Sequence, residues 1–329
     1  MGWTYNAPEG TATSGPRIAA IVLTFTSVAL LIVCARLYVR AWMIKAMGYD
    51  DSVIIVAWLG ACAYTTTTVI QTKWGLGITS LDDMPPENIY NFGLAQYIGA
   101  PFYVLGIWGF KTSLLLSYLR FIPIQGYRIA IIVIGVVVAV AHIGFICSFL
   151  FLCTPIAKQW DLSITDRHCG EGVSFYLTFS ALTIIFDMIV FVLPFPVLVK
   201  SNIQLRRKIA LLCLFALGIF VTVIQVIRIH TIKNLSNYLN SSNPILWSII
   251  ENDIGIIIAS VPTLAPLVKY YSERSRNASG NDLQPPEPQY GLQSRRSANN
   301  KYSSGDAVRE SSDEHDAPKK YTDSTEHII

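Results

Sequence analysis

Five ionisable side chains stand inside long apolar segments of this 329-residue chain: Lys111, His142, Asp187, Glu251 and Asp253. A charge at the depth of a lipid bilayer costs roughly 3 to more than 10 kcal/mol, so each such group needs a partner or a water-filled cavity. Buried carboxylic acids also serve as proton donors in catalysis. These five residues are therefore candidates for ion pairing, for binding a ligand, or for proton transfer.

The segments that carry these groups are long enough to span a membrane as helices. A span needs about 20 mainly apolar residues, because each residue rises about 1.5 Å across a hydrocarbon core of about 30 Å. None of the segments shows the alternation of a membrane barrel strand, so their backbone hydrogen bonds must be made within helices. We predict an all-α polytopic membrane protein, a seven-transmembrane-helix bundle. Its helices are expected near residues 18–39, 52–71, 93–119, 129–152, 173–199, 209–229 and 245–268.

The composition excludes several other classes of protein. Only 14% of the residues are charged, against about a quarter in an ordinary soluble domain. A soluble two-domain enzyme, a nucleic-acid binder and a disulfide-stapled secreted module do not fit. We divide the chain into a short extracellular or lumenal N-terminus (1–17), the membrane domain (18–269) and a tail (270–329). The tail is rich in Ser, Asn, Gln, Pro and mixed charge, so we expect it to be disordered and cytosolic.

The loops predict an N-terminus outside and a C-terminus in the cytosol. With that orientation twelve basic residues, among them Arg36, Arg40 and Arg120, fall on the inner side and six on the outer side. Cys153 and Cys169 share one outer loop, where a disulfide would contribute about 3 kcal/mol. Asn234 and Asn240 begin Asn-x-Ser sequences in another outer loop and are expected to be glycosylated there.

Helical rise indicates which buried charges lie at the same depth. Measured from the basic residues that end their helices, Lys111 lies roughly 14 Å and Asp187 roughly 20 Å above the inner face, within reach of one another. Arg228 and Glu251 both lie near the outer face, and they form the second predicted pair. Asp253 points about 200° around the helix from Glu251, so we expect it to be solvated at the mouth of the bundle.

The functions of these groups stay open at this point. The Lys111–Asp187 pair is either a structural salt bridge that sets helix register, or the polar floor of an outward cavity or a switch. Pro194 and Pro196 lie just inward of Asp187 and favour a kink there. His142 is either a packing residue, a hydrogen-bond partner of Asp187, or part of a ligand site or proton relay.

Seven short motifs, in order between residues 18 and 269, resemble those of the fungal rhodopsin-like integral membrane family. Two positions depart from the family pattern, with Thr79 in place of a histidine and Ser260 in place of a cysteine. The motifs are Gly48-Tyr49-Asp50-Asp51; Trp74-Gly75-Leu76-Gly77; Lys111 to Arg120; Cys153-Thr154-Pro155 with Trp160 and Cys169; Asp187 with Leu193-Pro194-Phe195-Pro196; Arg206-Arg207-Lys208-Ile209 with Gly218 and Arg228; and Trp247 with Glu251 and Pro262.

The resemblance implies a fungal source and two kinds of relative: receptor-like proteins of plant-pathogenic fungi, and membrane proteins of toxin or secondary-metabolite clusters. Our leading hypothesis is a receptor-like or pathway-accessory protein that binds a small apolar or amphipathic molecule in an outer cavity floored by Lys111, Asp187 and Glu251. An alternative is a membrane-embedded enzyme of the acid-initiated cyclase type, with Asp187 or Glu251 as the catalytic acid. A transporter is the third hypothesis, although no repeated halves are evident.

No recognisable catalytic, phosphate-binding or metal-binding motif occurs in the sequence, so we predict no cofactor and no metal site and favour a non-enzymatic role. The expected partners are the lipid bilayer, a small-molecule ligand and a cytosolic signalling partner at the inner loops and tail, with no nucleic acid. We expect a multi-pass protein of the plasma membrane in preference to an internal membrane. The candidate ligand or cavity residues are Lys111, His142, Asp187, Arg228, Glu251 and Asp253.

Overall fold

Among the residues that the computed structural model describes, most belong to seven long helices. The structure describes residues 2–8, 10–80, 83–121, 124–161, 163–165, 168–194, 205–233 and 241–280, with side chains from 218 onward in α7 and up to 264 in α8. The long helices are α1 (Gly15–Tyr38), α2 (Tyr49–Lys73), α3 (Pro86–Phe121), α4 (Gln125–Leu150), α5 (Gly172–Val192), α7 (Leu205–Lys233) and α8 (Ser242–Gly280). The short elements are a π-helical turn, η1 (Val39–Met43), a 3₁₀ turn, η3 (Ile156–Gln159), and two paired strands, β1 (Cys153–Thr154) and β2 (His168–Cys169).

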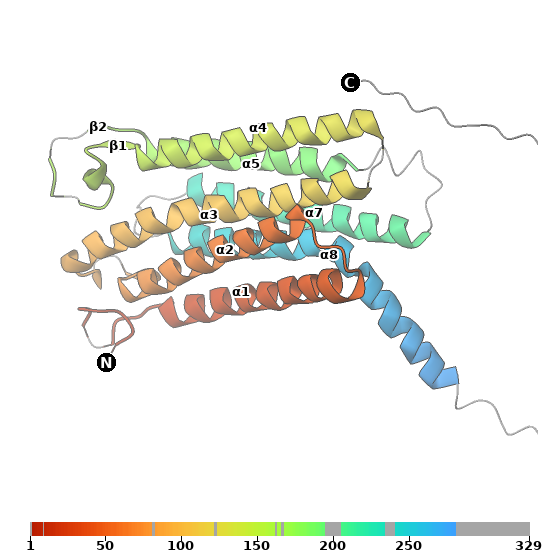
Figure 1. The fold of residues 1–329 in the computed structure, drawn as a ribbon. Coiled ribbons are helices and arrows are strands. Elements are labelled where there is room, and N and C mark those ends of the chain that lie inside the picture. Colours follow the sequence, from red (N-terminus) through yellow and green to blue (C-terminus); the bar gives the residue numbers. More distant parts are fainter. Residues whose placement is uncertain are drawn as a thin grey trace, which may run out of the picture. The chain divides into compact units, whose positions relative to one another are not determined.

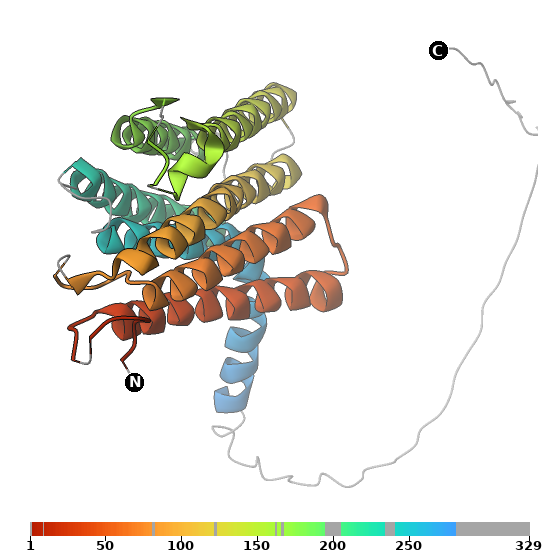
Figure 2. The same ribbon diagram turned by 90° about the vertical axis from the view of Figure 1, so that its left-hand side faces the viewer.

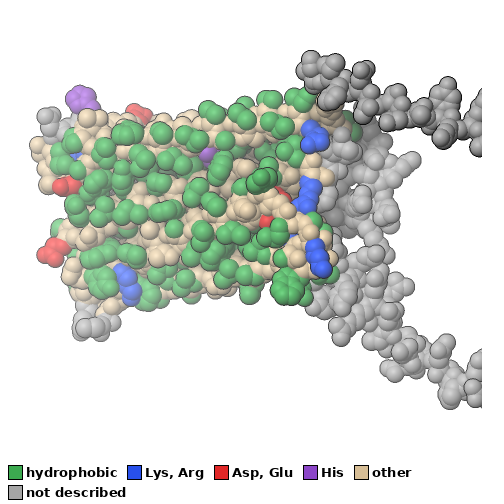
Figure 3. Space-filling model, viewed as in Figure 1, with side chains coloured by type: hydrophobic (Ala, Val, Ile, Leu, Met, Phe, Trp, Pro, Cys, Tyr) green, Lys and Arg blue, Asp and Glu red, His purple; other side chains and the backbone are tan. Residues whose placement is uncertain are grey.

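The length and the apolar composition of these helices are those of membrane-spanning helices. Within the described residues, α1 with η1, α2, α3, α4, α5 and α8 are each long and apolar enough to cross a membrane, and residues Gly218–Ile232 of α7 form a further apolar segment. Hydrophobic side chains cover the long side of the bundle in Figure 3, while basic side chains gather toward one end. Such a surface is typical of a helix bundle whose sides contact the lipid of a membrane. The prediction of an all-α polytopic membrane protein is confirmed.

Helix α3 occupies the centre of the arrangement. It packs on α2, α4 and α5, while α1 packs on α2 and α5 on α7. Figures 1 and 2 show these helices lying side by side, with the β1–β2 hairpin and the start of the chain at the same end of the bundle. The most apolar stretches of α3 and α8 are each 67% buried, against 17% for α4. Helices α3 and α8 are therefore the interior of the bundle, and α4 faces the lipid over most of its surface.

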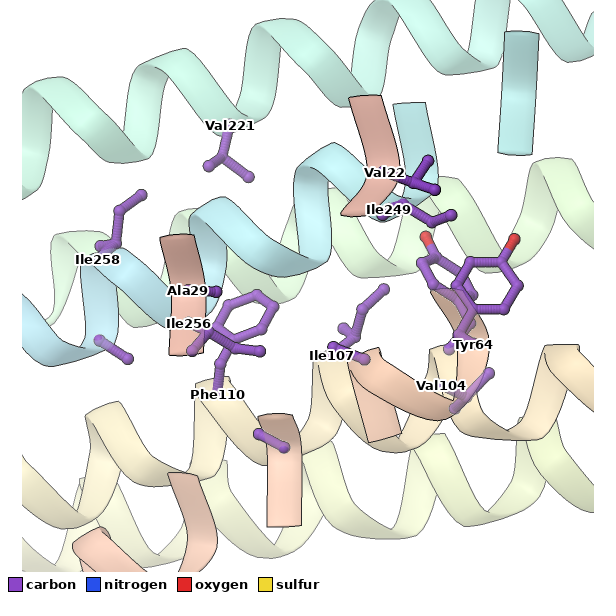
Figure 4. Close-up of a cluster of buried hydrophobic side chains, with 14 of the residues drawn as sticks. Val22, Ala29, Tyr64, Val104, Ile107, Phe110, Val221, Ile249, Ile256 and Ile258 are labelled. Carbon is purple, nitrogen blue, oxygen red and sulfur yellow. The ribbon is translucent and has the colours of Figure 1, made fainter. Parts of the chain in front are cut away.

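The apolar core brings together side chains from helices far apart in the sequence. In Figure 4, Tyr64 of α2 and Ile107 of α3 lie among side chains of α1, α7 and α8. Two glycines let α3 and α8 approach closely. A Cβ atom on Gly106 would stand 2.2 Å from the Asn252 side chain, and one on Gly255 would stand 2.6 Å from Phe110. Small residues at such crossings are the usual basis of helix association in membranes.

Several helix ends differ from the prediction, and two of them bear on the predicted tail and kink. Helix α8 continues to Gly280, eleven residues past the predicted end of the membrane domain at residue 269, so the chain leaves the bundle as a helix. Helix α5 ends at Val192 and passes into a turn that includes Pro194, because proline cannot donate the next helical hydrogen bond. Pro196, Asn234 and Asn240 and the tail beyond Gly280 lie outside the described residues, so the predictions for them are untested.

An arginine–aspartate cluster, which the sequence analysis did not predict, joins four helices at the N-terminus of α2. We define it as Arg36, Arg40, Asp50, Asp51 and Arg120. Arg36 is fully buried; its Nη2 lies 2.7 Å from Asp50 Oδ2, its Nε lies 2.9 Å from Asp51 Oδ1, and its Nη1 donates to the Ala259 carbonyl of α8. Arg40 and Arg120 also approach Asp50, at 3.1 and 3.6 Å.

The cluster also determines where α2 begins. The Asp51 carboxylate accepts the backbone N–H of Gly48, and both aspartates stand in the first turn, where the helix dipole favours negative charge. Arg36 and Arg40 were counted as inner-loop charges in the sequence analysis. The structure does not place them in a loop, because α1 continues through Tyr38 into η1 and both side chains turn into the protein.

Candidate functional site

A cavity of about 610 Å³ opens among the helices at the end of the bundle that carries the disulfide loop. Its walls come from α2, α3, α4, α5, α7 and α8 and from the loop between α4 and α5. Most of the wall is apolar, and seven aromatic side chains contribute to it: Tyr64, Tyr97, Tyr103, Phe149, Trp160, Tyr176 and Phe179. A space of this size and lining is typical of a small-molecule site.

The loop over the cavity is held by the predicted disulfide. Cys153 and Cys169 are bonded, and β1 pairs with β2 in antiparallel register, with each cysteine opposite the other. Trp160 in this loop packs on Tyr97 of α3, with ring centroids 4.8 Å apart. Both cysteines and Trp160 line the cavity. The disulfide therefore fixes part of the wall of the cavity as well as the loop itself.

Arg228 of α7 is a buried charged residue in the wall of the cavity. It is 2% exposed, its Nη1 lies 2.8 Å from Glu251 Oε2, and its Nη2 donates to Ser180 Oγ at 2.9 Å. The guanidinium carbon also lies 5.5 Å from the centre of the Tyr103 ring. Among the described residues its Nε has no hydrogen-bond partner. The predicted Arg228–Glu251 ion pair is present, and its cationic member reaches the cavity.

A chain of polar contacts continues from Arg228 into the middle of the bundle; we call Arg228, Glu251, Gln225, Asp187 and Lys111 the central polar chain. The Gln225 Nε2 atom donates to Glu251 at 2.6 Å and to Asp187 at 2.5 Å. Lys111 Nζ lies 2.9 Å from Asp187 Oδ1, as predicted, and donates to the Thr183 carbonyl. The central polar chain links α3, α5, α7 and α8 and contains two positive and two negative side chains.

The cavity does not have the floor that the sequence analysis expected. Lys111, Asp187 and Glu251 do not line it. They lie deeper, and Arg228 is the member of the central polar chain that faces the space. Glu251 is covered on this side by Tyr103, whose hydroxyl donates to Glu251 Oε2 at 3.1 Å.

The expectation that Asp253 is solvated at the mouth was wrong. Asp253 is fully buried, and its Oδ2 accepts a hydrogen bond of 2.9 Å from Thr26 of α1. The Thr26 hydroxyl lies 2.8 Å from that of Thr65 on α2. The 200° turn from Glu251 directs Asp253 toward α1 and α2, which cover that face of α8. A residue near a helix end is exposed only where no neighbouring helix extends past it.

His142 does not contact Asp187. Its Nδ1 lies 2.7 Å from the Val138 carbonyl of its own helix, and its ring packs near Phe179 and Phe186, with centroids 6.2 and 6.0 Å away. Among the alternatives, this geometry agrees with a packing residue.

Gln225 and Tyr103 are the members of the site that the sequence analysis missed. Each is a polar or amphipathic residue inside an apolar helix, and Gln225 lies three positions before Arg228, on the same face of α7. That spacing was the available signal. Because Gln225 carries no charge, its place between two ion pairs does not follow from the positions of the ionisable groups alone.

The helices are apolar, ion pairs lie inside the bundle, and a cavity lies beside the loop at one end. These features are those of a polytopic helical membrane protein with a cavity large enough for a small molecule. Residues 35–270 match the model of the fungal rhodopsin domain, and the chain belongs to that family. The resemblance inferred from the seven motifs is thus confirmed.

Several fungal relatives share most of this span at low identity. The chain is 24% identical over 280 residues to polyenoic acids biosynthesis gene cluster protein Ba17b of Metarhizium anisopliae, covering 80% of this chain and 76% of that protein. It is 24% identical over 266 residues to receptor GIN3 of Arthrobotrys oligospora, covering 79% of this chain and 64% of the receptor. A SAT4 family membrane protein of Emericella nidulans is 23% identical over 238 residues, covering 71% of this chain and 58% of the relative. The last two relatives are thus spanned over less than two thirds of their length.

Proposed function

We propose that the protein is a receptor-like or pathway-accessory membrane protein that binds a small amphipathic molecule in the aromatic cavity. The observation that carries this proposal is the cavity of about 610 Å³, mostly apolar, with Arg228 among its few polar lining residues. Its apolar walls suit the body of such a molecule, and the Arg228 guanidinium suits orientation of a polar end. The printed names of the relatives, which include a receptor and products of biosynthetic clusters, favour the same two roles.

The central polar chain supplies a route from the ligand to the helices. A molecule that binds to Arg228 weakens or strengthens the contacts of Arg228 with Ser180 and Glu251. Gln225 in turn connects Glu251 to the Lys111–Asp187 pair through its two hydrogen bonds. A ligand shifts a conformational equilibrium only through contacts that differ between the two states. In this proposal those contacts are the ones made by Arg228, and the cytosolic readout is a partner at the inner loops and tail.

The experiment uses the full chain in lipid nanodiscs and an organic extract of the producing fungus. Val173 lines the cavity at the start of α5 and is 46% exposed, so tryptophan there narrows the cavity at a tolerant position. Val137 is 51% exposed on α4 and does not line the cavity, which makes Val137→Trp the matched control. We expect mass spectrometry to recover a bound compound from wild type and Val137→Trp, and at least about tenfold less from Val173→Trp, a loss of about 1.4 kcal/mol.

The chemical state of the bound compound separates the candidate functions. A receptor or accessory protein returns it unchanged. Time-dependent conversion that is lost in Glu251→Gln would contradict the proposal and favour the membrane-embedded cyclase. Equal recovery from both tryptophan variants would also contradict it, because the compound would then bind outside the cavity.

We further propose that the disulfide end of the bundle, with the N-terminus, faces outside and that the C-terminus is cytosolic, at the plasma membrane. Both the hairpin and the start of the chain stand at that end (Figure 1), and disulfides form on the oxidising side of a membrane. We expect endoglycosidase treatment to increase the gel mobility of the wild type and to leave an Asn234→Gln/Asn240→Gln variant unchanged. A reporter at the C-terminus should meanwhile be protected from external protease in intact cells. Cleavage of that reporter would reverse the orientation.

A further inference from the structure

The chemistry of Arg228 and its surroundings restricts the class of ligand. Its cationic group is already matched by Glu251 at 2.8 Å, and Lys111 is matched by Asp187 at 2.9 Å. The central polar chain is therefore neutral as a whole before any ligand binds. Its hydrogen-bonding capacity is not used up, because a guanidinium has five N–H donors and the described contacts of Arg228 are those of Nη1 to Glu251 and Ser248 and of Nη2 to Ser180.

A charged ligand group beside Arg228 would disturb this balance. A carboxylate there would place an extra negative charge next to Glu251, in a place where both partners of the existing ion pair are almost completely buried. An ammonium group would meet the guanidinium itself. Charges removed from water are costly unless each has its own counter-charge. A neutral oxygen acceptor, by contrast, satisfies an N–H donor without changing the charge of the site.

The aromatic walls describe the rest of the molecule. Tyr64 and Tyr103 have ring centroids 5.2 Å apart, and Tyr103 stands edge-on to Phe179 at 6.1 Å. Elsewhere in the lining, Tyr97 packs against Trp160 of the disulfide loop. Rings held by one another in this way offer flat, rigid surfaces, which favour planar or conjugated apolar groups.

Resting on the proposed function, we propose that the cavity selects uncharged molecules with a planar apolar body and a carbonyl, ester or similar oxygen acceptor that receives a hydrogen bond from the Arg228 guanidinium. The other cation of the lining, Lys158, belongs to the disulfide loop, and its Nζ donates to the Ile164 carbonyl in that loop. Lys158 therefore stabilises the covering loop, and Arg228 is the specificity-determining residue.

Three matched probes test this selection in nanodiscs, with protein-free nanodiscs subtracted: pyrenebutyric acid methyl ester, pyrenebutyrate and butylpyrene. All share the planar body, and only the polar end changes. We expect the ester to bind about tenfold more tightly than butylpyrene, since a hydrogen bond to a charged donor is worth about that factor. We expect pyrenebutyrate at pH 7 to bind at least about tenfold more weakly than the ester.

An Arg228→Met/Glu251→Gln double variant removes the donor and keeps the core neutral. In this variant the ester should lose its advantage over butylpyrene, while butylpyrene itself binds as before. Lys158→Met should retain the ester preference. Tighter binding of pyrenebutyrate than of the ester, or an ester preference that survives in the double variant, would overturn the inference and leave the proposed function intact. Binding of none of the three probes above protein-free nanodiscs would overturn the proposed function itself.

Discussion

Replacement of Arg36 by methionine should lower the free energy of unfolding by about 3 to 5 kcal/mol, the largest effect that we expect from a single substitution. Methionine keeps much of the length of the side chain but removes its charge. Arg36 contacts Asp50, Asp51 and the Ala259 carbonyl, and no part of it is exposed. Its loss leaves two buried carboxylates with the more distant Arg40 and Arg120 and removes the hydrogen bond that links this cluster to α8. The measurement is unfolding by SDS in mixed micelles.

Arg17 provides the control for this prediction on the same helix. It is exposed at the other end of α1, so Arg17→Met should change the unfolding free energy by no more than about 0.5 kcal/mol. If Arg36→Met and Arg17→Met were equally stable, the arginine–aspartate cluster would have no structural role.

Lys111→Met and Asp187→Leu should each destabilise the protein by about 3 kcal/mol or more, because each leaves the other member of the pair as an uncompensated buried charge. The double variant Lys111→Met/Asp187→Leu should lose much less than the sum. We expect an interaction energy of about 2 to 3 kcal/mol from the double-mutant cycle. The physical basis is the 2.9 Å contact between two fully buried groups of α3 and α5.

A second cycle gives the reference for additivity. Lys45 is exposed and far from the pair in sequence, so Lys45→Met combined with Asp187→Leu should be additive within about 0.5 kcal/mol. Additivity in the Lys111–Asp187 cycle as well would mean that the pair contributes no mutual stabilisation. The outcome also informs function, since a strongly coupled pair fixes helix register, and a weakly coupled one is free to change partners when a ligand meets Arg228.

The number of long helices and the relative levels of their charges were predictable, because both depend on one helix at a time. An apolar segment in lipid must satisfy its backbone internally, which makes it a helix, and the fixed rise of that helix converts residue number into height. This reasoning correctly paired Lys111 with Asp187 and Arg228 with Glu251. The disulfide between Cys153 and Cys169 was predictable for a similar reason, since the two residues share one short loop.

Height alone does not say which direction a side chain faces or what covers it. Asp253 is buried because α1 and α2 extend past it, and Arg36 and Arg40 are buried because α1 continues into η1 beside the start of α2. Gln225 joins the two ion pairs only because α5, α7 and α8 converge at one point. The cavity likewise needs six helices and a folded loop around one space. By itself the sequence determined which segments are helices and which charges lie at the same level along them. The rotation, overlap and convergence of the helices were decided by tertiary packing, because these depend on neighbours that no single segment encodes.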